Sequence, residues 1–208
     1  MFITLEGMDG SGKTTVIQRL KKDLEAQGYS VVLTREPGGL EICEKIRTIL
    51  LDKDDNKMES WTETLLFIAA RKEHLEKLIK PELEKGNIVI SDRFLDSTTA
   101  YQGGARNLGV DRIQSLQEEV LGDCLPNLTL YFKLSFEEAE KRISKRLQDK
   151  NRLDEETQLF KEKVKEAFEK IVIQNPERVK VVDASLDENG VYESSIKIIR
   201  EELSKWKK

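Results

Sequence analysis

The chain has 208 residues, which suits one well-packed α/β domain and is short for two. Charged residues of both signs make up 36% of it and the net charge is -4, so it lacks the basic field that would attract a nucleic acid or an anionic membrane surface. The first predicted strand begins at residue 2 and no apolar run approaches the ~18 residues of a membrane span, so we expect no signal peptide, no membrane anchor and a cytoplasmic location.

Short apolar runs of β-prone residues alternate along the chain with stretches in which apolar residues recur at helical spacing. We expect strands at 2–5, 30–33, 88–90, 128–132 and 179–182. Between and after them we expect helices at 15–24, through 42–50, over about 61–84, at 111–121, over about 135–146, over about 154–173 and at 191–206. A polar linker lies at 52–57 and a polar break at 149–151. Five strands separated by helices predict the α/β class, with a doubly wound, five-stranded parallel sheet in a single domain over 1–208.

The strongest motif lies between the first strand and the first helix and reads Gly7-Met8-Asp9-Gly10-Ser11-Gly12-Lys13-Thr14. It fits G-x-x-x-x-G-K-[ST], the phosphate-binding P-loop, whose glycines let backbone N–H groups at a helix N-terminus surround anionic oxygens. Lys13 is then expected to contact the β- and γ-phosphates, and the Thr14 hydroxyl is placed to bind a Mg²⁺ ion that bridges them. The motif therefore predicts a site for a nucleoside triphosphate.

Two charged residues end the third predicted strand, on the side where ligands bind in open α/β sheets. Asp92 stands where a carboxylate would orient Mg²⁺ or its waters, and Arg93 could meet a phosphate. The plain alternative is an Asp–Arg pair on the surface.

Four further residues are candidates for binding a second substrate. Arg35 and Arg47 lie in and after the loop that follows the second strand, where a guanidinium could hold a phosphoryl group, although single arginines are more often solvated. Phe67 and Arg71 are four residues apart on the long predicted helix and so share a face. A ring beside a planar guanidinium could bind a nucleobase, although Phe67 read alone is more often plain core.

Arg142, Arg146 and Arg152 flank the polar break in a highly charged segment. They could close over the phosphates as a lid over about 142–155, and Arg146 and Arg152 are then catalytic candidates together with Lys13, Asp9 and Arg93. The alternative is that they balance the neighbouring glutamates on solvated helices.

Taken together, five motifs resemble those of one family in order and spacing: the P-loop with an acidic residue, then 34–39, 66–71, 92–94 and 100–103. The family is that of the thymidylate kinases of bacterial type, among the P-loop nucleoside monophosphate kinases, and the likeness runs nearly end to end. It implies a cytoplasmic homodimer that transfers the γ-phosphoryl group of ATP to dTMP with Mg²⁺, giving dTDP for dTTP synthesis.

The resemblance also implies where the base and the sugar of dTMP bind. It places Phe67 against the thymine ring, Arg71 on a base carbonyl, Thr98 and Gln102 near the base edge, and Tyr101 under the deoxyribose. Position 94, where tyrosine is common in the family, is a phenylalanine in this chain.

For the phosphate side, the resemblance places Arg47 and Arg93 on the dTMP phosphate and Asp9 near the sugar hydroxyl, and it includes Arg35 and Glu36 in the dTMP site. This P-loop contains no arginine, which resembles the branch of the family that supplies an arginine from the lid.

Two other functions remain open at this point. One is another small-molecule P-loop kinase with a nucleoside or a different nucleotide as acceptor, which only the acceptor pocket would distinguish. The other is a P-loop switch protein, but the nearest string to Asn-Lys-x-Asp is 56–59, which ends in Glu and lies in a polar linker.

Overall fold

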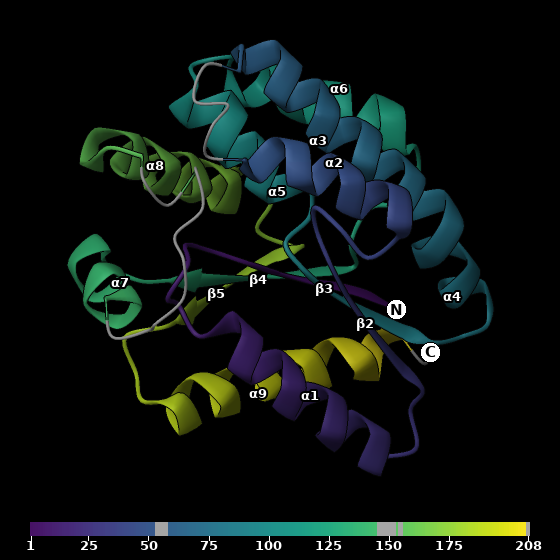
Figure 1. Cartoon of the computed structure of the whole chain (residues 1–208). Helices are drawn as coiled ribbons and strands as arrows, with labels where there is room; N and C mark the ends of the chain where they lie inside the picture. Colours follow the sequence, from purple (N-terminus) through teal and green to yellow (C-terminus); the bar gives the residue numbers. More distant parts are fainter. Residues whose placement is uncertain (53–57, 145–152, 154–155, 207–208) are drawn as a thin grey trace.

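The computed structural model shown in Figure 1 describes residues 1–52, 58–144, 153 and 156–206. Its five strands are β1 (Phe2–Glu6), β2 (Val31–Arg35), β3 (Ile88–Asp92), β4 (Leu128–Lys133) and β5 (Val179–Asp183). They form one sheet in the order β2-β3-β1-β4-β5, and every neighbouring pair is parallel. The predicted five-stranded parallel sheet is thereby confirmed.

The helical segments lie on both faces of this sheet. They are α1 (Lys13–Ala26), α2 (Glu41–Leu51), α3 (Ser60–His74), η1 (Leu75–Ile79), α4 (Lys80–Glu84), α5 (Leu95–Thr98), η2 (Thr99–Ala105), α6 (Val110–Leu121), α7 (Phe136–Ile143), α8 (Gln158–Gln174) and α9 (Glu188–Trp206). In Figure 1, α1 and α9 cover one face, while α2, α3, α6 and α8 lie over the other. Across the described residues, no helix combines the length and the apolar composition needed to cross a membrane.

The sheet is buried because its central strands carry apolar side chains on both faces. All five residues of β1 are buried, and Ile3 and Leu5 pack in one cluster with Leu20 of α1 and Ile199 of α9. Each such side chain contributes about 1.5–3 kcal/mol through removal from water. This packing fixes the carboxyl ends of β1 and β3 side by side.

The long helix predicted over 61–84 forms, but it is interrupted. The π-helical segment η1 separates α3 from α4, and Pro81 follows at the start of α4. Proline lacks the N–H that an α-helical bond requires and crowds the carbonyl one turn earlier, which accounts for the wider turn just before it.

The two helical segments that follow β3 were not predicted from the sequence. α5 and η2 contain two threonines in succession and the pair Gly103-Gly104, which have low helix propensity. Packing overrides this, because a Cβ on Gly104 would lie 2.5 Å from the Cβ of Ala167 on α8. Only glycine lets η2 approach α8 this closely.

Three predicted helix ends fall elsewhere in the structure. α7 begins close to the predicted start, where the Ser135 hydroxyl caps it by accepting from the Glu138 N–H at 3.3 Å. α7 ends at Ile143, and residues 145–146 lie outside the described residues. α8 begins at Gln158 rather than near 154, because the Thr157 side chain caps it. α9 begins at Glu188, three residues before the predicted start.

Candidate active site

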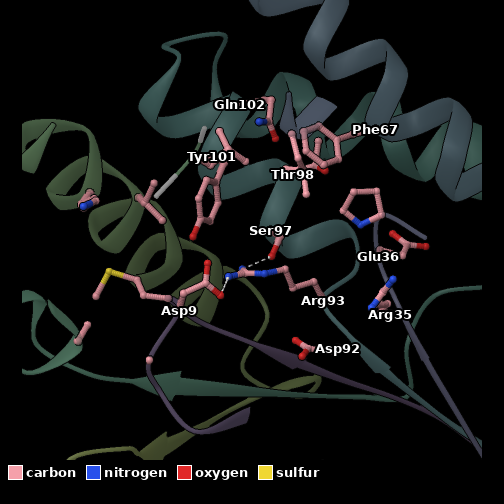
Figure 2. Close-up of a pocket in the computed structure, with 18 of the residues that line it drawn as sticks. Asp9, Arg35, Glu36, Phe67, Asp92, Arg93, Ser97, Thr98, Tyr101 and Gln102 are labelled. Carbon is pink, nitrogen blue, oxygen red and sulfur yellow. Dashed lines mark hydrogen bonds and ion pairs between the residues drawn. The ribbon is translucent and has the colours of Figure 1, made fainter. Parts of the chain in front are cut away.

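A cavity of about 560 Å³ opens at the carboxyl ends of β1, β2 and β3. It is lined by most of the predicted site residues, namely Met8, Asp9, Gly10, Thr14, Arg35, Glu36, Arg47, Phe67, Arg71, Asp92, Arg93, Thr98, Tyr101 and Gln102. The labelled side chains in Figure 2 converge from the P-loop, the end of β2 and the loop after it, α3, the end of β3 and the helices after β3. Segments far apart in the sequence thus meet at one end of the sheet.

The P-loop needs its glycines because it lies tightly against neighbouring backbone. Gly7 and Gly10 have φ of 135° and 81°, and a Cβ on Gly7 would lie 2.7 Å from the carbonyl oxygen of Phe132. Gly7, Ser11, Gly12 and Lys13 form the loop without lining the cavity. This curvature presents the N-terminus of α1 to the cavity, as anion binding requires.

Lys13 is buried and folded onto its own loop. Its Nζ donates to the carbonyl oxygens of Gly7 and Met8, each at 3.0 Å. Burial lowers the pKa of this ammonium group. The two carbonyls hold the cation within reach of the space above the loop.

Asp92 and Thr14 provide oxygen atoms suited to a hard cation. Thr14 Oγ1 lies 3.5 Å from Asp92 Oδ2. Asp92 Oδ1 is the one buried side-chain polar atom without a hydrogen-bond partner among the residues that the structure describes. These residues also contain no group of three His, Cys, Asp or Glu that could hold a metal. The site therefore fits Mg²⁺, which keeps several waters and is bound largely by substrate phosphates.

Arg93 spans the floor of the cavity in a constrained conformation. Its φ of 70° is unusual for a residue other than glycine. Its Nη1 donates to Ser97 Oγ and its Nη2 to Asp9 Oδ1, both at 3.0 Å, as the dashed lines in Figure 2 mark. Arg93 is mostly buried, so it does not form the surface pair with Asp92 that was the plain alternative.

Glu6, which the sequence analysis did not select, supports this arrangement from below. It is fully buried at the end of β1, and it accepts hydrogen bonds from the Phe94 N–H at 2.7 Å and the Ser97 hydroxyl at 2.5 Å. Burial, and then the nearby Asp96, raises the pKa of Glu6 to about 8. In the sequence, Glu6 could have been identified as a charged residue at the end of a mainly apolar strand.

Arg71 is almost completely buried beneath the cavity. Its Nε donates to Glu36 Oε2 at 2.6 Å, its Nη1 to Thr98 Oγ1 at 3.1 Å and to Gln117 Oε1, and its Nη2 to the Phe94 carbonyl at 3.1 Å. Four protein acceptors thus fix the plane of the guanidinium. It still lines the cavity, where a rigid donor can meet a planar ligand.

Gln117, which accepts a hydrogen bond from Arg71, was also not selected from the sequence. Gln117 lies on the buried face of α6, four residues from both Ile113 and Leu121, and a polar residue at such a position was the available signal. His74 supports the Glu36 carboxylate that pairs with Arg71, since its Nδ1 contacts Glu36 Oε1 at 2.9 Å and its Nε2 contacts Thr34 Oγ1 at 2.7 Å.

Arg35 and Arg47 lie on the side of the cavity formed by the loop after β2. Arg35 pairs with both carboxylate oxygens of Glu44 at 2.9 and 3.1 Å, and Arg47 donates to the Pro37 carbonyl at 2.7 Å. Burial, and then the charge of Arg35, lowers the pKa of Arg47. Two cations close to one another favour a ligand with negative charge.

The lid residues are described only in part. The Arg142 Nη1 donates to the Ala184 carbonyl at 2.9 Å, and Arg142 does not line the cavity. Arg146 and Arg152 lie outside the described residues.

Comparisons with known proteins were made for the whole chain. Residues 5–195 match the family model described as thymidylate kinase. A thymidylate kinase of Mesoplasma florum is 64% identical, over 100% of this chain and 99% of that protein. One of Bacillus pumilus is 46% identical over 99% and 97%. The crystal structure of thymidylate kinase from Ehrlichia chaffeensis has a TM-score of 0.77 at 36% identity and covers 96% of this chain and 98% of its own. The chain therefore belongs to the thymidylate kinase family of phosphoryl-transferring enzymes.

Proposed function

We propose that this chain transfers the γ-phosphoryl group of ATP to dTMP, giving dTDP and ADP for dTTP synthesis. One observation carries the proposal: the P-loop with Thr14 and Asp92 shares a single cavity with Phe67 and Arg71. A phosphate-binding loop alone indicates only nucleotide binding, whereas a buried aromatic and guanidinium pair beside it indicates a second, planar substrate.

On the donor side, the P-loop backbone binds the phosphates of ATP and Lys13 neutralises part of their charge. Thr14 and Asp92 are the residues that would hold Mg²⁺, directly or through its waters. The ion would neutralise charge on the β- and γ-phosphoryl oxygens. The chain's own part is to orient the γ-phosphoryl group toward the acceptor.

On the acceptor side, Phe67 stacks on the thymine ring, a contact worth about 1–3 kcal/mol per base. Arg71, Thr98 and Gln102 contact the base edge, and Tyr101 lies under the deoxyribose. Every one of these side chains lines the cavity, which supports the assignment.

The remaining cavity residues bind the phosphate of dTMP and set its position. We assign this role to Arg47 and Arg93, with Arg35 and Glu36 bordering the same site, and we place Asp9 near the sugar hydroxyl. The bond from Arg93 to Asp9 supports a fixed geometry between them. An acceptor oxygen held in line with the γ-phosphoryl group is what such positioning achieves.

We further propose that residues 142–155 act as a lid whose Arg146 and Arg152 reach the transferring phosphoryl group. The lid and the rest of the chain form one domain over 1–208. A cation from the lid supplies charge that the P-loop does not, since it contains no arginine. We also propose a homodimer, which is supported by exposed apolar side chains on the adjacent helices α2 and α3. We propose a cytoplasmic location, where the proposed donor ATP is available.

The test is the release of ADP from ATP and Mg²⁺ with a panel of acceptors. We expect dTMP to have the highest kcat/KM, with AMP, GMP and thymidine far below it. Faster turnover of any of these three would assign the chain to the other candidate function, a P-loop kinase with a different acceptor. Binding of nucleotide with no transfer to any acceptor would instead favour a switch protein.

A further inference from the structure

Glu63 is a buried carboxylate that plays no part in the reaction described above. It lies on α3 one helical turn before Phe67 and two before Arg71, on the same face, and none of its side chain is exposed. Its Oε1 accepts from the Gln102 Nε2 at 2.8 Å. Glu63 does not line the cavity, whereas Gln102 does. Glu63 therefore contacts a residue of the base site from behind.

Arg106 supplies the charge that makes this buried carboxylate stable. Its Nε lies 3.2 Å from Glu63 Oε1 and its Nη2 lies 3.2 Å from Oε2, so the guanidinium spans both oxygens. It also pairs with Glu156 at 2.5 Å. Burial alone would lower the pKa of Arg106, but the bonds to Glu63 and Glu156 raise it. A carboxylate paired in this way accepts hydrogen bonds and donates none.

The pairing fixes which end of the Gln102 amide faces the cavity. Because Glu63 only accepts, the amide must present its NH₂ group to Glu63, and its Oε1 is left on the opposite side. Figure 2 shows this oxygen directed toward the space between Tyr101 and Phe67. No hydrogen-bond partner for Oε1 is found in the part of the chain that the structure describes.

An acceptor at this position distinguishes thymine from cytosine. Thymine carries a proton on N3 and can donate to the oxygen, whereas N3 of cytosine carries a lone pair and would face it unfavourably. We propose that Glu63 is a positioning residue that locks the Gln102 amide and thereby selects thymine over cytosine. This inference rests on the proposed function, and it concerns a residue that the substrate does not touch.

The test compares dTMP and dCMP as acceptors for the parent and for Glu63→Gln. Glutamine at 63 is of equal size but can donate as well as accept, so the Gln102 amide is free to turn over. We expect the ratio of kcat/KM for dTMP to that for dCMP to fall at least about tenfold, mainly through KM, as loss of a binding contact predicts. An unchanged ratio would overturn the inference.

Two matched variants separate positioning from general damage. Glu63→Asp keeps a group that only accepts, so it should retain the parent ratio even if both KM values rise. In a Gln102→Met background no amide remains to be oriented, so adding Glu63→Gln should leave the ratio unchanged. If Glu63→Gln lowers the ratio equally in that background, Glu63 does not act through Gln102.

A measurement on the parent protein covers the case in which Glu63→Gln does not fold. The side-chain amide protons of Gln102, identified by their loss in Gln102→Met, should exchange slowly with solvent whether or not dTMP is bound, because they face Glu63. Fast exchange in the free protein would overturn the inference. The two proposals fail separately: a parent inactive toward dTMP contradicts the function, and an active parent with fast exchange or an unchanged ratio contradicts only the role of Glu63.

Discussion

Buried charged side chains hold the floor of the cavity, and Glu6 is the clearest case. Its carboxyl group bonds both to the backbone after Arg93 and to the hydroxyl that receives the Arg93 guanidinium. One side chain at the end of β1 thereby fixes the main chain and the side chain of the same arginine. Such double support explains how Arg93 keeps a left-handed backbone conformation.

The raised pKa of Glu6 predicts how stability depends on pH. Burial, and then Asp96, raises the pKa from its usual 4.5 to about 8, so the folded protein binds a proton that the unfolded chain releases above pH 4.5. The contribution of this proton to the free energy of unfolding is fully present below pH 4.5 and is lost as pH rises through about 8. We expect the free energy of unfolding in urea to fall between pH 5 and 9, and Glu6→Gln to reduce this slope.

Glu76→Gln is the matched control for that experiment. Bonds to Lys72 and Lys80 lower the pKa of Glu76 to about 2, so its proton is exchanged only in acid. It should leave the slope between pH 5 and 9 unchanged. Equal slopes for the parent and Glu6→Gln would contradict the assignment of the titrating group.

Which site residues could be predicted depended on whether they belong to a motif. The P-loop, Asp92, Arg93, Phe67 and Arg71 were selected from a motif, from the end of a strand or from helical spacing, and all but part of the P-loop line the cavity. Glu63, Gln117 and Glu6 were missed because their partners lie 39, 46 and 88 residues away along the chain. Their burial follows only from the fold.

Among the helices, contact between η2 and α8 forms one wall of the cavity. Gly104→Ala would place a methyl group 2.5 Å from the Cβ of Ala167, closer than such atoms approach. We expect this overpacking to lower the free energy of unfolding by about 1–3 kcal/mol. In urea unfolding, the double variant that combines Gly104→Ala and Ala167→Gly should have a higher free energy of unfolding than Gly104→Ala alone. If the second substitution recovers no stability, the close contact is not the cause.

The helix predictions succeeded or failed for a physical reason. α1, α6 and α9 were predicted because their apolar residues recur at helical spacing on one face, which packs against the sheet in α1 and α9 and against other helices in α6. α5 and η2 were missed because their glycines and threonines disfavour a helix in isolation. There, a close fit to other helices decides the conformation, and a single sequence does not report it.

The lid proposal predicts a loss of rate without a loss of stability. An arginine that acts on the transferring phosphoryl group is worth about three to five powers of ten in kcat, whereas a surface ion pair contributes about 0–1 kcal/mol to stability. We expect Arg146→Ala or Arg152→Ala to lower kcat at least about a hundredfold, a cautious part of that range. KM for dTMP and the Tm should change little.

Arg142→Ala is the control, because this guanidinium bonds to the Ala184 carbonyl and does not line the cavity. It should keep kcat within a few-fold of the parent. If Arg146→Ala and Arg152→Ala do so as well, the charge of the transferring group must be met by Arg93 or Arg47 instead.

For the molecule as a whole, the distribution of exposed apolar side chains bears on assembly. Ile42 and Ile49 lie seven residues apart on one face of α2 and are 52% and 49% exposed, and Leu65 on α3 is 55% exposed. Figure 1 shows α2 and α3 side by side on the outer surface, so two neighbouring helices carry these exposed apolar side chains. Large apolar side chains exposed on neighbouring elements are typical of a protein interface.

We therefore expect the parent to sediment as a dimer. The double variant that combines Ile49→Lys and Leu65→Lys should sediment as a monomer, because each copy would bury unpaired charges in a symmetric interface. Ile173→Lys is the matched control, since among the described residues Ile173 on α8 is the most exposed large apolar side chain, at 78%, but it lies on another helix. It should remain a dimer. A parent that is monomeric throughout the micromolar range would contradict the proposed homodimer, and dissociation by Ile173→Lys would place the interface on α8 instead of on α2 and α3.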